Sequence, residues 1–279
     1  MDNPIAITQL KAMLQREVSS ICTYKVNAWN APIATVLNEI KESNIDAVFF
    51  GGTLRTLLLS RLHLQRNGRP RDVDLVVVGT DIHELKQRFK KNLIRETRFG
   101  GLQIRLSNWD FDIWPLHQTW AFLRDEVNNP QLSDLPYTTF FNLEAIAVDI
   151  KEQGTNQGRT IYSGDEQFFR GILTKTLEIN RIDNPFPALC VVRAFVLVLS
   201  TKFSIGPRLT HYLVTTGPTL TDDELFESQM AHYGQIYGSV KQIREWLDKV
   251  RLVADQNRCS RILVTDNSDM VYRSTPKIA

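Results

Sequence analysis

The chain has 279 residues and a mass of 32.0 kDa, a length that suits one large domain or two small ones. Hydrophobic residues make up 43% of it and charged residues 23%, which is ordinary globular composition and argues against long disordered tracts. Lys and Arg number 33 and Asp and Glu 31, so the formal net charge is +2. This balance excludes a basic field over the whole protein, and any nucleic-acid contact would have to come from local patches.

Cysteine spacing and hydropathy indicate the compartment. Cys22, Cys190 and Cys259 lie far apart and form no CxxC pair, so we expect neither a disulfide framework nor a cysteine zinc site, and a reducing, cytoplasmic location. The first residues, Met-Asp-Asn-Pro, do not resemble a secretory signal. The most apolar window, residues 188–199, is too short to cross a bilayer and contains Arg193, so no membrane span is expected.

The first half of the chain is predicted to alternate between helix and strand. Apolar residues at steps of three and four predict helices, and short apolar or alternating runs bounded by turn residues predict strands. The predicted elements are two helical segments within residues 1–40, a strand at 47–50, a helix at 53–64, a strand at 72–78, a helix at 82–91, and strands at 102–106 and 109–114.

After about residue 136 the strand signal fades and helical spacing dominates. Helices are predicted at residues 140–150, 166–179, 187–202, 222–230 and 239–253. The chain is therefore expected to have an α+β fold, with a mixed head over residues 1–136 and an all-helical body over residues 137–279.

The most informative stretch combines a glycine pair with two aspartates. Gly51 and Gly52 lie between a predicted strand and a predicted helix. This turn would let backbone amides approach a phosphate at the positive end of the helix. Asp72 and Asp74 alternate along the next strand and therefore share a face. Such a carboxylate pair suits a hard divalent cation such as Mg²⁺.

A third carboxylate is available farther along the chain, where Asp110 and Asp112 alternate on another predicted strand. Each piece alone is commonplace, since a Gly-Gly pair is most often only a turn and strand carboxylates are often solvated. Taken together and in this order, they match two-metal phosphoryl chemistry. The combination favours a metal site over a solvated strand face.

These residues also resemble a known family. The runs 49–55, 57–59 and 72–76 resemble the head domain of bacterial poly(A) polymerases and CCA-adding tRNA nucleotidyltransferases, members of the polymerase-beta-type nucleotidyltransferase superfamily. Residues 141–147 and 192–203 show a weaker similarity to two further motifs of that family. The resemblance implies a five-stranded type of sheet followed by a helical neck.

The resemblance also implies roles for particular residues. Asp72 and Asp74 would bind two Mg²⁺ ions, with Mn²⁺ as an alternative, and Asp112, preferred over Asp110, would complete the first metal site. Catalysis would depend on the same three carboxylates. The residues implied to bind the nucleotide are Gly51, Gly52, Thr53, Arg55 and Arg193, although Arg193 could equally serve a packing contact.

Departures from the family concern the choice of base and acceptor. Arg55-Thr56 stands where the family has Arg-Asp, and residues 138–140 replace its Arg-Arg-Asp. The base-reading motif falls on residues 186–190, Phe-Pro-Ala-Leu-Cys, which offer almost no side-chain hydrogen bonds to a base edge. Ordered CCA addition is therefore not expected.

The expected function is metal-dependent transfer of a nucleoside monophosphate from a nucleoside triphosphate to a hydroxyl, with release of pyrophosphate. The resemblance implies an RNA 3′ end, and tRNA in particular, as the favoured acceptor, because enzymes of the family use RNA. Basic runs at 66–71 and 88–98 flank the motifs and would suit RNA phosphates, although such runs are more often a solvated surface. Two alternatives stay open: modification of a protein or small molecule, as in a toxin or defence component, and a non-catalytic nucleotide-binding regulator.

Overall fold

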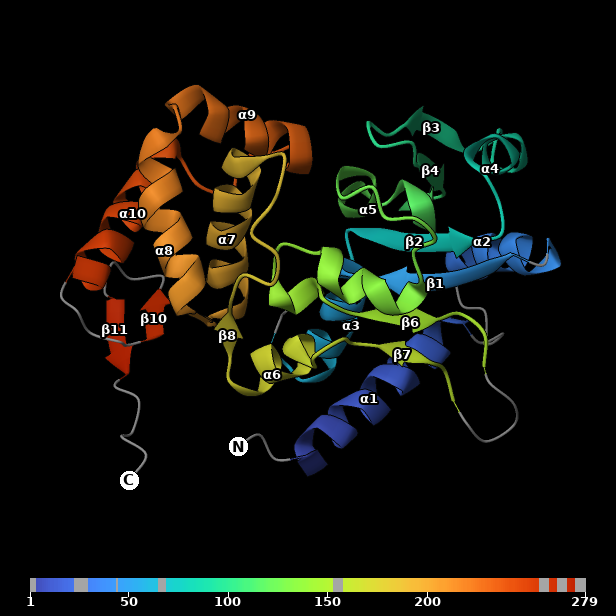
Figure 1. Cartoon of the computed structure of the whole chain (residues 1–279), viewed down its shortest axis with the longest axis horizontal. Helices are drawn as coiled ribbons and strands as arrows, with labels where there is room; N and C mark the ends of the chain where they lie inside the picture. The colour runs from blue at the N-terminus through green and yellow to red at the C-terminus, as the bar shows by residue number, and fades with distance from the viewer. Residues whose placement is uncertain are drawn as a thin grey trace. The chain divides into compact units, whose positions relative to one another are not determined.

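A computed structural model describes residues 4–22, 30–43, 45–64, 69–152, 158–255, 261–264 and 270–273 (Figure 1). The chain forms two compact units. The first consists of Met1–Thr139 and Leu143–Arg170, and the second of Phe140–Asn142 and Gly171–Ala279. The functional domains predicted from the sequence, with their boundary at residue 136, stay a prediction.

Seven strands of the described residues form the mixed sheet of the first unit. β2 and β5 pair in parallel, and every other neighbouring pair is antiparallel. In spatial order the strands are β3 (Leu93–Glu96), β4 (Leu102–Leu106), β5 (Trp109–Pro115), β2 (Asp72–Val78), β1 (Asp46–Phe50), β6 (Ala147–Asp149) and β7 (Ile161–Tyr162).

Helices of the first unit pack on this sheet and on each other. α1 contacts α3 through an apolar stripe that includes Leu14 and Val18, both fully buried, and α2 and α3 contact β1. The elements are α1 (Pro4–Cys22), α2 (Ala31–Glu42), α3 (Gly52–Arg61), α4 (Ile82–Arg88), α5 (Trp120–Arg124) and the 3-10 helices η1 (Leu116–Gln118) and η2 (Leu132–Thr138). The short helices η3 (Asn142–Glu144) and α6 (Gln167–Leu173) each cross the boundary between the units.

One face of the sheet changes character along β2. Because side chains alternate, Asp72 and Asp74 share their face with Val76, which joins a hydrophobic cluster with Leu116 of η1, Phe122 of α5 and Leu135 of η2. The opposite face of β2 carries fully buried valine and leucine side chains. The apolar end of the carboxylate face is thus covered by η1, α5 and η2, and the polar end lies at the start of β2.

The second unit is helical with a small sheet. α7 supplies much of its core, because most of its apolar side chains are buried. The helices are α7 (Pro187–Thr201), α8 (Pro207–Thr216), the 3-10 helix η4 (Gly217–Thr219), α9 (Asp222–Tyr233) and α10 (Val240–Asp255). The sheet, in spatial order, consists of β11 (Met270–Arg273), β10 (Arg261–Val264), β9 (Ser204–Ile205) and β8 (Thr176–Leu177).

The α+β class predicted from the sequence is confirmed, and the strand predicted at 72–78 has the observed bounds. The helix predicted at 140–150 is wrong: that stretch contains η3 and then β6, which pairs with β1. The helix predicted at 166–179 ends at Leu173, and β8 follows. The sheet is larger than the five-stranded type that the resemblance implied, since β6 and β7 extend it beyond β1.

Two other predictions concern the surroundings of the protein. Across the described ranges, no helix is both long enough and apolar enough to span a bilayer. Cys22 and Cys190 are buried and form no disulfide bond among the described residues, and burial raises the pKa of Cys22 to about 11. Cys259 and Arg66 lie outside the described residues.

Candidate active site

The glycine pair forms the turn between β1 and α3. Gly51 has a φ of +57°, a conformation that glycine adopts at little cost. Its amide donates to the carbonyl of Ile146 at 3.0 Å, and its carbonyl accepts from Arg55 N at 3.1 Å. No described side chain caps the amino end of α3, so its first amides point away from the helix without a side-chain acceptor, as at many phosphate-binding helix ends.

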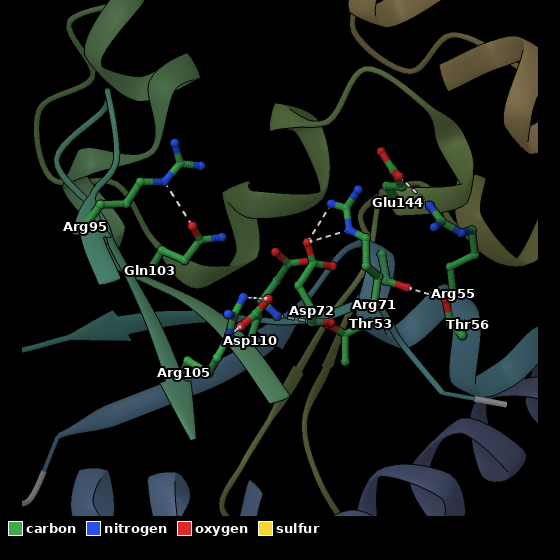
Figure 2. Close-up of polar contacts among 12 residues, drawn as sticks. Thr53, Arg55, Thr56, Arg71, Asp72, Arg95, Gln103, Arg105, Asp110 and Glu144 are labelled. Atoms are coloured by element: carbon green, nitrogen blue, oxygen red, sulfur yellow. Dashed lines mark hydrogen bonds and ion pairs between the residues drawn. The ribbon is translucent and has the colours of Figure 1, made fainter. Parts of the chain in front are cut away.

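Thr53 ties this turn to β2. Its hydroxyl accepts from the backbone amide of Asp74 at 2.9 Å and lies 3.4 Å from the carbonyl of Asp72, to which it donates. The side chain is buried. Thr53 thus fixes the start of α3 against the two aspartates, and this positioning contact was not part of its predicted role in nucleotide binding. Thr53 and Asp72 are labelled in Figure 2.

The parallel pairing of β2 and β5 arranges four carboxylates in two rows. Asp72 is the register partner of Asp110, and Asp74 is the partner of Asp112. All four lie on one face, because each strand contributes alternate residues, and all four are partly buried. The outer row consists of Asp72 and Asp110, and the inner row of Asp74 and Asp112.

Arginines neutralise the outer row. Arg71 Nη2 lies 2.6 Å from Asp72 Oδ2, and its Nε lies 3.1 Å from the same oxygen. Arg105 makes a two-pronged contact with Asp110, at 2.5 Å from Nε to Oδ1 and 2.8 Å from Nη2 to Oδ2. Both pairs are visible in Figure 2. Each outer carboxylate therefore already has a cationic partner.

The inner row has no ion-pair partner among the described residues. Burial raises the pKa of Asp74 well above its usual value, and the negative charges of Asp72, Asp112 and Glu144 raise it further. Burial, and then the charge of Asp72, raises the pKa of Asp112 to about 6. Within the described part of the chain, the buried Oδ1 of Asp112 has no hydrogen-bond partner. Such crowding of carboxylates is typical of functional sites rather than of stabilising ones.

These observations test whether the residues suit a divalent cation. The donors are carboxylate oxygens, one of which is buried and has no partner among the described residues. A cation would relieve their mutual repulsion, so the donor chemistry fits Mg²⁺. Over the described ranges, however, no group of three or more His, Cys, Asp or Glu side chains is already arranged so that it could hold a metal ion. Side-chain movement would be needed to gather the ligands.

The structure adds a residue that the sequence analysis missed. Arg55, predicted to contact the nucleotide, forms an ion pair with Glu144 of η3, and both are labelled in Figure 2. The two side chains are 15% and 7% exposed, respectively. The sequence held one signal for this residue: Glu144 is the single acidic residue between Phe140 and Val148 in an otherwise apolar stretch.

Arg193 belongs to the second unit. It lies in α7, and its guanidinium lies over the ring of Phe141, 5.6 Å from the centroid. Its predicted contact with the nucleotide stays a prediction. The segment that replaces the base-reading motif is in the same unit, where Pro187 opens α7 and Cys190 is buried.

Two further arginines, Arg69 and Arg95, lie in the first unit, which contains the carboxylates. Arg69 stacks over the ring of Trp109, 4.1 Å from its centroid. Arg95 Nε donates to Gln103 Oε1 at 2.9 Å, and Gln103 is the register partner of Asp112 across β4 and β5. A positively charged side chain therefore lies on the β3–β4 side of the carboxylates as well as beside Asp72.

No protein-family model matches the chain, and no curated protein matches it significantly. Solved structures do. A CCA-adding enzyme in complex with ATP matches with a TM-score of 0.56 and 16% identity over 85% of this chain and 54% of its own. A tRNA-processing enzyme in an apo form matches with 0.54 and 19% identity, over 82% of this chain and 59% of its own.

A third match is a tRNA nucleotidyltransferase in complex with a primer tRNA and an incoming ATP analogue, with a TM-score of 0.53, 17% identity, and coverage of 77% of this chain and 60% of its own. The chain thus spans between 54% and 60% of the length of these three structures. At such identities the matches establish the fold, and the resemblance predicted from the sequence is confirmed at that level.

Proposed function

We propose that this chain, which has the fold of CCA-adding enzymes and tRNA nucleotidyltransferases, transfers a nucleoside monophosphate from a nucleoside triphosphate to a hydroxyl acceptor and releases pyrophosphate. The observation that carries the proposal is the placement of Asp72, Asp74 and Asp112 on one face of two neighbouring parallel strands. Thr53 joins this face to the Gly51–Gly52 turn. Carboxylates beside an uncapped helix end suit phosphoryl transfer.

In this proposal the residues divide into two groups. The amides of the Gly51–Gly52 turn and the side chain of Arg55 bind the phosphates of the nucleotide. Asp72, Asp74 and Asp112 hold two Mg²⁺ ions, or Mn²⁺ instead. When bound, such ions activate the acceptor hydroxyl and neutralise charge on the leaving pyrophosphate. Asp110 is the less suitable third carboxylate, because Arg105 engages both of its oxygens, whereas the contacts of Arg71 with Asp72 go to Oδ2.

The favoured acceptor is an RNA 3′ end, with tRNA as the leading candidate and the cytoplasm as the location. Support comes from the matched structures that contain ATP and a primer tRNA, and from the arginines beside the carboxylates, which suit a phosphate backbone. Residues 186–190 provide little for reading a base edge. We therefore expect a mild base preference based on shape and stacking, not an ordered addition.

The test is a labelling assay with purified protein. Each of the four nucleoside triphosphates, labelled at the α-phosphate, is incubated with Mg²⁺ and either tRNA lacking its terminal nucleotides, total RNA or total lysate, with an EDTA arm as control. We expect label in RNA, from more than one nucleotide and only with the metal. Label in protein or in a small molecule would show that this molecule, and not RNA, is the acceptor. Nucleotide binding without transfer to any acceptor would identify a non-catalytic regulator instead.

A further inference from the structure

The ion pair between Arg55 and Glu144 joins two segments that are distant in sequence. Arg55 lies in the first turn of α3, and Glu144 lies in η3, shortly before β6. Arg55 Nη1 donates to Glu144 Oε1, and both side chains are largely removed from solvent. Burying two charges is costly unless each has a partner. The pair therefore holds each side chain in one position.

Backbone contacts fix the place where this pair lies. Gly51 N donates to Ile146 O, so the turn and the Glu144 segment run side by side. A Cβ added at Gly51 would lie 3.9 Å from the carbonyl oxygen of Glu144. A Cβ added at Gly52 would lie 3.5 Å from Arg55 Nη2 and 3.6 Å from Asp74 Oδ2. The guanidinium of Arg55 thus lies beside the turn, as does the carboxylate of Asp74.

The guanidinium also has unused hydrogen-bonding capacity. Arg55 Nε is buried and has no hydrogen-bond partner among the described residues, and Nη2 faces the space above Gly52. An arginine carries five N–H donors in a rigid fork that matches phosphate oxygens. Glu144 accepts from Nη1 and leaves Nη2, which lies beside the turn, for a further acceptor.

A carboxylate at position 144 is unexpected, because burial of a neutral side chain of similar size would cost less free energy than burial of a charge. Glu144 adds a fourth negative charge near Asp72, Asp74 and Asp112, which would repel a triphosphate if Glu144 were unpaired. Its benefit is restraint of Arg55. A long flexible side chain loses about 0.5–1.5 kcal/mol of entropy when a ligand immobilises it. A side chain that the fold already holds avoids this loss.

We propose that Glu144 is a positioning residue that holds Arg55 over the Gly51–Gly52 turn to bind the β- and γ-phosphates of a nucleoside triphosphate. The inference rests on the proposed function for its ligand. It assigns to Glu144 a role exerted through Arg55, and none in holding a metal ion. Binding measured without metal therefore tests it directly.

The experiment measures Kd for ATP and AMP in EDTA, with the full chain, by isothermal titration calorimetry. The proteins are wild type, Glu144→Gln, Arg55→Met and the double variant. Glu144→Gln should weaken ATP binding about two- to twelvefold, the range that corresponds to about 0.5–1.5 kcal/mol at 1.36 kcal/mol per decade. AMP, which lacks the outer phosphates, should bind as it does to wild type. In the Arg55→Met background, Glu144→Gln should have no further effect.

Two controls separate positioning from folding. Glu39→Gln removes a carboxylate that pairs with Arg88 at 3.4 Å elsewhere in the first unit, and it should leave both Kd values unchanged. Urea unfolding monitors the stability of each variant. Arg55→Met leaves a buried carboxylate without its partner and is expected to be destabilised. If it does not fold, Arg55→Lys takes its place in the cycle and should weaken ATP binding, because an ammonium lacks the guanidinium fork.

Several outcomes would overturn the inference. If Glu144→Gln binds ATP as tightly as wild type, or more tightly, Glu144 does not position Arg55 for phosphate. If the two substitutions have additive effects, Glu144 acts independently of Arg55. If wild type binds ATP but binding does not depend on Glu144, this inference is wrong and the proposed function is unaffected. If wild type binds none of the four triphosphates with or without Mg²⁺, both proposals are wrong.

Discussion

The two rows of carboxylates on β2 and β5 are one step apart along the same strands, yet their surroundings differ. Asp72 and Asp110 are each paired with an arginine. Asp74 and Asp112 have no ion-pair partner among the described residues, and their pKa values are raised. Asp110, whose two oxygens both accept from Arg105, therefore resembles an ordinary carboxylate at the charged edge of a sheet, whereas the inner row is under electrostatic repulsion. A protein tolerates such repulsion where a ligand relieves it.

The difference arises from position along the strand. Two residues of a strand cover about 6.6 Å, enough to move a side chain from the solvated edge to the space beside Thr53 and the Gly51–Gly52 turn. Asp74 N donates to the Thr53 hydroxyl, which fixes the inner row against α3. Arg71 and Arg105 are more exposed than the aspartates with which they pair, and both contact the outer row.

Exchange of one carboxylate in each row should have the largest effect on nucleotidyl transfer. Asp74→Asn should lower nucleotidyl transfer by about three to five decades, or about 4–7 kcal/mol at 1.36 kcal/mol per decade, while the protein stays folded. Asp110→Asn, the matched control in the outer row, should retain transfer to within about threefold. Both are measured as initial rates under saturating Mg²⁺. Equal losses in the two variants would show that Asp74 and Asp110 do not differ in function.

The raised pKa of Asp112 should make the stability of the protein depend on pH. Burial favours the neutral form of Asp112 in the folded protein and raises its pKa to about 6. The stability associated with the neutral carboxyl group is therefore fully present below about pH 4 and is lost as the pH rises through about 6. Asp112→Asn should abolish this loss. Relative to the variant, wild type in EDTA should therefore lose about 1–3 kcal/mol between pH 4 and 7, at 1.36 kcal/mol per pKa unit.

Urea unfolding at several pH values measures this effect, and Asp110→Asn serves as the comparison from the outer row. That variant should follow the wild-type curve closely. Parallel curves for wild type and Asp112→Asn would mean that the inner row is not under electrostatic strain.

The smallest expected effect concerns Arg105, which pairs with Asp110. Arg105 is 59% exposed, and Asp110 is 30% exposed, so solvent screens their attraction. Arg105→Gln should change the free energy of unfolding by less than about 1 kcal/mol. Thermal unfolding at low and high salt is the measurement. A larger loss would indicate that the outer pair is a structural element and not a solvated edge.

The sequence predicted the strands of the candidate site well, but not how they meet. Alternation showed that Asp72 and Asp74 lie on one face of their strand, and that Asp110 and Asp112 lie on one face of theirs. It could not show that β2 and β5 are parallel neighbours in register, because that depends on pairing between distant segments. Nor could it separate the rows, since burial is decided by α3 and the turn. The roles proposed for these residues stay predictions.

The largest error in the predicted fold has a physical cause. Residues 140–150 are apolar at spacings that suit a helix, but a buried strand and a buried helix cannot be distinguished by periodicity in so short a run. Pairing of β6 with β1 decided the outcome. Because of the same error, the role of Glu144 was missed: a helix at 140–150 gave no reason to expect Glu144 beside the Gly51–Gly52 turn.

The return of the chain to the first sheet after Asn142 has a practical consequence for protein production. A gene fragment ending at Thr139 would encode β1 and β2 but not β6 and β7. The backbone donors and acceptors of β1 that pair with β6 would then lie on an open edge lined by Val48, Phe49 and Phe50, and such edges promote intermolecular pairing and precipitation. A fragment extending to Arg170 retains every strand of that sheet and is the better candidate for crystallisation or NMR.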